Sequence, residues 1–131
     1  MKAYTPEDGN IWPGGALYPV CTLRLPVAEL AARVGVPLDA WEEDGMGDAT
    51  GFCAQLAAGP WVLVTEYAHS RREHQLGPAL EVDATVLAHL GVARALALLQ
   101  AEMGFGDEDL SWVSPDGQAA AREWLSRKLK R

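Results

Sequence analysis

The chain has 131 residues, of which 49% are hydrophobic, and a formal net charge of −7. This is the usual size of one domain, with enough apolar residues to bury a core without a metal or disulfides. The negative charge argues against binding to a phosphate backbone except through the basic C-terminal residues, and no apolar run approaches the roughly 20 residues of a membrane span.

The first sixteen residues are punctuated by proline and glycine, and we expect 1–16 to form an irregular N-terminal arm. The run 17–25 then predicts a strand. Pro26 suits the first position of a helix, and apolar residues recur at helical spacing from there to Gly35, a typical helix stop. We therefore predict a helix between Pro26 and Gly35.

The next part of the chain is predicted to be a turn, a loop and then strands. Residues 37–43 favour one helical turn, and the glycines and carboxylates of 44–51 favour a loop. Gly59 and Pro60 separate two apolar runs and predict a β-hairpin, and a polar connection leads to a third short strand. The expected strands are 52–57, 61–67 and 80–83.

A long apolar helix is predicted over 85–103, because its apolar positions recur at helical spacing and it carries only two charged side chains. Its stripe is His89, Val92, Leu96, Leu99 and Met103. A strand at 110–113 follows, and Ser114 with Pro115 indicates the start of a last helix.

Strands joined by short turns favour antiparallel pairing. We therefore predict a single α+β domain over 17–131, with a mainly antiparallel sheet of about four to five strands and helices packed on one face. The first ten residues lack the apolar segment of a secretory signal, so we expect a cytoplasmic protein. Cys21 and Cys53 each lie in an apolar run, where buried free thiols are expected rather than a disulfide.

No motif identifies a catalytic or metal site. His69 and His74 are five residues apart, which does not place both on one helical face, and two arginines between them oppose a cation. His89 falls within an apolar stripe, where a hydrogen-bonded packing role is expected. We expect no metal, no cofactor and no catalytic residue.

Charge is distributed unevenly along the chain. Residues 122–131 hold five basic side chains against one acidic one, so the rest of the chain is strongly acidic. Two acidic segments contain no basic residue, and such segments attract a basic protein partner and accelerate its association. They contain Asp39, Glu42, Glu43, Asp44 and Asp48 in the first, and Asp107, Glu108 and Asp109 in the second.

Trp41 lies within the first acidic segment. An aromatic side chain surrounded by carboxylates has the composition of an interface anchor. The alternative is a tryptophan packed onto the protein's own core. We predict that Trp41 and the two acidic segments form the contact with a protein partner.

Parts of the chain resemble small bacterial immunity proteins, which neutralise a toxin delivered by a neighbouring cell. The resemblance is one of layout over about half the chain. It consists of a Gly-led hairpin from Gly51-Phe52-Cys53 to Trp61-Val62-Leu63-Val64, a strand end at Val82-Asp83, a long Leu/Ala helix and the run Asp109-Leu110-Ser111-Trp112-Val113. It implies a compact, acidic, non-catalytic protein that binds a toxin.

Two other classes of function are compatible with the same sequence. One is a small subunit or adaptor of an endogenous bacterial complex. The other is a small enzyme whose pocket uses His69, His74 or His89. The sequence does not distinguish a monomer from a homodimer.

Overall fold

The chain is described by a computed structural model for residues 1–4, 16–43, 45, 47–68 and 77–115. Within these ranges it is an α+β domain with a seven-stranded antiparallel sheet and three α-helices. The elements are β1 (Lys2–Ala3), β2 (Leu17–Leu23), α1 (Val27–Val34), β3 (Asp39–Glu43), β4 (Gly47–Gln55), β5 (Trp61–Tyr67), β6 (Ala79–Asp83), α3 (Ala84–Leu90), α4 (Val92–Met103), the 3-10 turn η1 (Asp107–Asp109) and β7 (Leu110–Val113). The predicted fold class is confirmed, and the sheet has more strands than expected.

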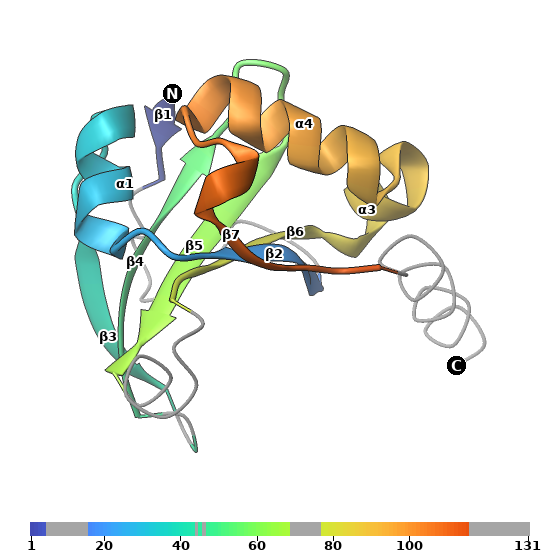
Figure 1. The fold of residues 1–131 in the computed structure, drawn as a ribbon. Helices are drawn as coiled ribbons and strands as arrows, with labels where there is room; N and C mark the ends of the chain where they lie inside the picture. Colours follow the sequence, from blue (N-terminus) through green and yellow to red (C-terminus); the bar gives the residue numbers. More distant parts are fainter. Residues whose placement is uncertain (5–15, 44, 46, 69–76, 116–131) are drawn as a thin grey trace.

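The sheet runs in the order β1-β4-β5-β6-β2-β7, and β3 also pairs with β4. Figure 1 shows α1, α3 and α4 on the same face of the sheet. Buried residues of all three helices form one core with side chains of the central strands, among them Phe52, Val62 and Val64. The strand predicted at 80–83 is β6, which lies inside the sheet and pairs antiparallel with β5 and β2.

Helix α1 follows the predicted boundaries. Pro26 precedes its first residue, and Gly35 ends it with a φ of 71°, a left-handed conformation that glycine adopts without steric cost. Val27, Leu30 and Ala31 are buried against the core. The spacing of these apolar side chains therefore determines which face of α1 meets the sheet.

The prediction of one continuous helix over 85–103 is wrong. Gly91, with φ 84° and ψ 160°, separates α3 from α4, and the two helices are bent by 106°. Asp83 caps α3 by accepting a hydrogen bond from the Thr85 N–H at 2.8 Å. In the described ranges no single helix is long and apolar enough to span a membrane, and α3 and α4 satisfy that test only as a bent pair.

The bend also changes which side chains are buried. Ala95, Leu99 and Met103 are the buried residues of α4, whereas His89 of α3 is exposed. The predicted packing role for His89 is therefore wrong. A helix that changes direction at Gly91 presents a different face to the core on each side of the break.

Three further predictions differ from the structure. Lys2–Ala3 forms β1, paired with β4, so the arm predicted over 1–16 is not irregular throughout, and 5–15 lie outside the described residues. Residues 39–43 form a strand instead of a helical turn. Trp112, whose place on a predicted strand favours burial in the core, is instead 41% exposed. The last helix predicted after Pro115 lies outside the described residues.

Candidate functional site

The first acidic segment forms a β-hairpin made of β3 and β4. The register places Glu42 opposite Asp48 and Glu43 opposite Gly47. Gly45 and Gly47 have φ values of 78° and 80°, which allow the tight reversal between the strands. The prediction of a loop over 44–51 is therefore wrong for 47–51. The two glycines, Gly45 and Gly47, are the sequence signal that could have indicated a hairpin.

The carboxylates of this hairpin lie in solvent. Asp39, Glu42 and Asp48 are exposed. Glu42 and Asp48 are direct cross-strand neighbours, and like charges in that position destabilise a sheet. Asp44 lies outside the described residues, and only the backbone of Glu43 is described. We call this β3–β4 hairpin the acidic hairpin; its exposed carboxylates are those of Asp39, Glu42 and Asp48.

Trp41 packs against its own sheet. It is only partly exposed, and a Cβ built on Gly51 would lie 3.0 Å from its Cη2 atom. Its indole nitrogen is buried and has no hydrogen-bond partner among the described residues. The structure thus places Trp41 as a side chain packed onto β4, and an anchoring role toward a partner stays a prediction.

The second acidic segment lies elsewhere, between α4 and β7. Asp109 accepts a hydrogen bond from the Gly106 N–H at 2.9 Å, and Asp107 accepts one from the Gln100 side chain at 2.8 Å. Asp107 and Glu108 are exposed, and Asp109 is partly buried. Since β7 and β3 lie toward opposite ends of the strand order, the structure does not bring the two acidic segments together.

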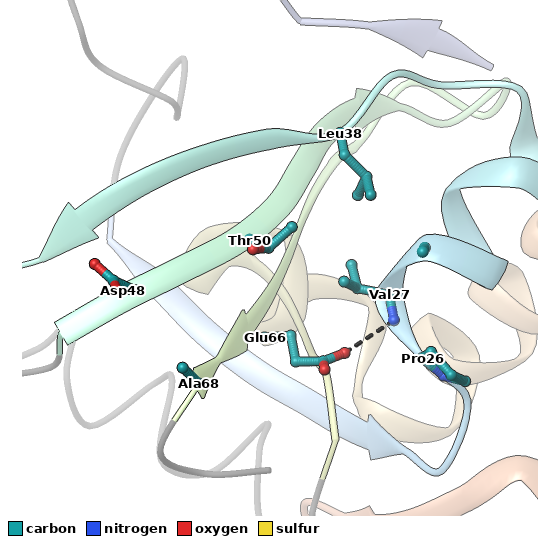
Figure 2. Close-up of a pocket in the computed structure, with 8 residues that line it drawn as sticks. Pro26, Val27, Leu38, Asp48, Thr50, Glu66 and Ala68 are labelled. Carbon is teal, nitrogen blue, oxygen red and sulfur yellow. Dashed lines mark hydrogen bonds between the residues drawn. The ribbon is translucent and has the colours of Figure 1, made fainter.

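A cavity of about 500 Å³ lies between the start of α1 and the adjoining end of the sheet. Figure 2 shows Glu66 reaching from β5 toward α1, with Thr50 on the neighbouring strand and Leu38 above it. The lining residues are Pro26, Val27 and Ala28 at the start of α1, then Leu38, Asp48, Thr50, Glu66 and Ala68. The cavity therefore combines an apolar wall with two carboxylates and a hydroxyl.

Glu66 holds one side of this cavity in place. It is 7% exposed, and its Oε2 accepts a hydrogen bond from the Val27 N–H at 2.9 Å. The N-cap residue, Pro26, makes no side-chain capping hydrogen bond, so Glu66 supplies the missing acceptor from the sheet. Its negative charge also lies at the positive end of the α1 dipole.

Sequence reasoning did not identify this cavity. Glu66 is 39 residues from Val27, and only strand pairing places it opposite Thr50. A single carboxylate within the apolar run Trp61–Tyr67 was the one available signal. A carboxylate that is buried on a strand needs a polar partner nearby, so Glu66 could have indicated a polar site beside this strand.

The remaining candidates do not join this cavity. His89 lies on α3 and is not among the lining residues, and His69 and His74 lie outside the described residues. In the described part of the chain no group of three or more His, Cys, Asp or Glu side chains is placed to hold a metal ion.

Both cysteines are free and buried, as expected. They lie on β2 and β4, which are separated in the sheet by β5 and β6. Burial raises the pKa of each thiol, Cys21 and Cys53, to about 12. A thiol with such a pKa is a poor nucleophile at neutral pH, because the thiolate is the reactive form.

Comparison of the chain with protein-family models, with curated proteins and with solved structures gave no match. The proposals below are therefore based on the geometry and charge of this chain.

Proposed function

We propose that this chain is a non-catalytic binding protein whose acidic hairpin contacts a basic protein. The observation that carries the proposal is the direct pairing of two exposed carboxylates, Glu42 and Asp48, across β3 and β4. Such a pair costs stability, and local rules of stability are most often broken at functional sites. A basic partner removes the repulsion by placing cations beside both groups.

The position of β3 makes this surface accessible. Within the described residues β3 pairs only with β4, so its outer side is a sheet edge. Charged side chains on an edge strand prevent unspecific pairing with other strands. The same charges steer a protein of opposite sign toward the edge and increase its association rate.

We further propose that the partner is a basic protein toxin and that binding neutralises it. The net charge of −7 and the exposed acidic hairpin support a basic partner, and the resemblance in layout to bacterial immunity proteins supports a toxin. The proposed partner site comprises the acidic hairpin and Trp41 in the middle of β3, and the second acidic segment is the next surface to test.

The test begins with the genes beside the coding sequence of this chain. A neighbouring open reading frame is expressed alone and together with this chain, and growth is measured. We expect growth arrest with the neighbour alone and recovery with both. Arrest that co-expression does not relieve would count against the immunity role and favour an adaptor in an endogenous complex.

Binding rates then test the surface. The double variant Asp39→Asn/Glu42→Gln should lower the rate constant of association with the toxin about tenfold at low salt. The rate constant of dissociation should change little. Glu108→Gln removes one charge from the second acidic segment and is the comparison. Slower association only in Glu108→Gln would move the contact to that segment, and unchanged rates in both variants would contradict an electrostatic contact.

A further inference from the structure

We infer that the cavity beside α1 receives an arginine side chain of the partner, an inference that rests on the proposed function. Two carboxylates, Asp48 and Glu66, face one 500 Å³ space together with the apolar start of α1. A cavity of this volume is within the range of sites that hold small ligands.

The polar wall is built by strand pairing. Thr50 on β4 pairs with Glu66 on β5, and Asp48 lies two residues from Thr50, so all three point to the same face of the sheet. Asp48 is exposed and Glu66 is buried, so Asp48 lies at the mouth of the cavity and Glu66 in its interior. The charge of Asp48 attracts a cation from solvent.

The start of α1 carries partial positive charge, which would repel a cation. Glu66 compensates this charge, because it accepts the hydrogen bond of the Val27 N–H. The compensated helix end leaves the charge of Asp48 to act on the ligand. The Thr50 hydroxyl adds an acceptor for an N–H donor of the ligand.

The apolar wall matches the stem of an arginine. Pro26, Val27 and Leu38 line the cavity, and Leu38 is 38% exposed, one of the few large apolar side chains in solvent within the described ranges. An arginine buries its methylene groups along apolar surface and keeps its guanidinium beside polar groups. The planar guanidinium also donates to two acceptors at once, which suits a wall where the Asp48 carboxylate and the Thr50 hydroxyl lie on the same face of β4.

The experiment uses the whole chain and a small probe, N-acetyl-arginine amide. Its neutral isostere, N-acetyl-citrulline amide, is the control ligand. Backbone amide chemical shifts are followed during titration up to about 10 mM of each compound. We expect saturable shifts at Leu38, Thr50 and Ala68 with the arginine compound and at least tenfold weaker binding of the citrulline compound.

Two variants that each remove one negative charge locate the probe. Asp48→Asn should weaken binding of the arginine compound at least fivefold. Glu29→Gln alters an exposed carboxylate of α1 that is outside both the cavity lining and the proposed partner contact, and it should leave binding unchanged. A third variant, Thr50→Val, should weaken binding less than Asp48→Asn. Equal binding of both compounds, equal loss in Glu29→Gln and Asp48→Asn, or no saturable shift would each overturn the inference.

The same measurements separate this inference from the proposed function. If the arginine compound does not bind but Asp39→Asn/Glu42→Gln still slows association with the toxin, the cavity assignment is wrong and the proposed function stands. If the compound binds through Asp48 but that double variant associates at the normal rate, the proposed acidic contact is wrong and the cavity remains an arginine site.

Discussion

Glu66 and Val27 are joined by a hydrogen bond of 2.9 Å that ties the first residue of α1 to strand β5. The cap of the helix is therefore supplied by the sheet. This contact fixes the direction in which α1 leaves the sheet, and with it one wall of the cavity.

Loss of this contact should destabilise the fold. We expect Glu66→Ala to reduce the free energy of unfolding by about 1–3 kcal/mol, because it leaves a helix N–H without its acceptor. Glu66→Gln keeps an acceptor oxygen and should cost less. Urea denaturation measures both variants, and a cost below about 0.5 kcal/mol for the alanine variant would show that solvent replaces Glu66.

Core packing of α4 should depend on Leu99 more than on Leu96. Leu99 has 0% exposure, whereas Leu96 is only partly buried. We expect Leu99→Ala to cost about 2–5 kcal/mol, as large-to-small changes in packed cores do. Leu96→Ala is the matched control and should cost clearly less in the same urea titration. The reverse order would mean that α4 is rotated relative to the sheet.

Gly51 should not tolerate a side chain. A Cβ there would lie 1.9 Å from the carbonyl oxygen of Val64, so β4 and β5 would have to move apart. We expect Gly51→Ala to cost about 1–3 kcal/mol or more. Gly45→Ala is the control, because Gly45 has a positive φ but no atom near its Cβ position, and it should cost about 1 kcal/mol. Thermal melts of the two variants test this ranking.

Cys21 and Cys53 should be unreactive in the folded chain. Burial raises the pKa of both thiols from 9.0 to about 12, so little thiolate is present at neutral pH. Alkylation by iodoacetamide, followed by mass spectrometry, should be slow for native protein and complete in denaturant. Rapid labelling of either thiol in the native state would show that its strand opens locally.

The same pKa values give a direction for stability at high pH. The unfolded chain loses its thiol protons near pH 9.0, whereas the folded chain holds them until about pH 12. The contribution of the thiols is therefore complete below pH 9.0 and is lost as the pH rises from there toward about 12. Urea midpoints should fall across this window, and the double variant Cys21→Ala/Cys53→Ala should show a smaller fall.

Elements with local stop signals were predicted well. Pro26 and Gly35 delimit α1, and Gly59 with Pro60 lies in the turn between β4 and β5. In these places one or two residues restrict the backbone enough to determine the element. The α+β class follows from such signals, because short turns favour antiparallel neighbours.

Elements that depend on distant partners were missed. Trp41 and its neighbours form β3 because β4 is beside them, although their carboxylates favour solvent and loops. The break at Gly91 was missed because the apolar residues of α3 and α4 continue through it at helical spacing. The cavity required the pairing of Thr50 with Glu66, which no local pattern encodes.

One edge of β4 is closed by two separate pieces of chain. β3 pairs with 47–51, and β1 pairs with Ala54 and Gln55, with the Tyr4 N–H donating to the Cys53 carbonyl at 2.9 Å. The first four residues thus cover the edge of β4 at Cys53, Ala54 and Gln55, which carry no charge. Deleting these four residues would expose backbone N–H and C=O groups of β4, with which a second copy of the chain can pair. Self-association is the expected result. An affinity tag placed before Met1 for the binding measurements therefore needs a flexible spacer.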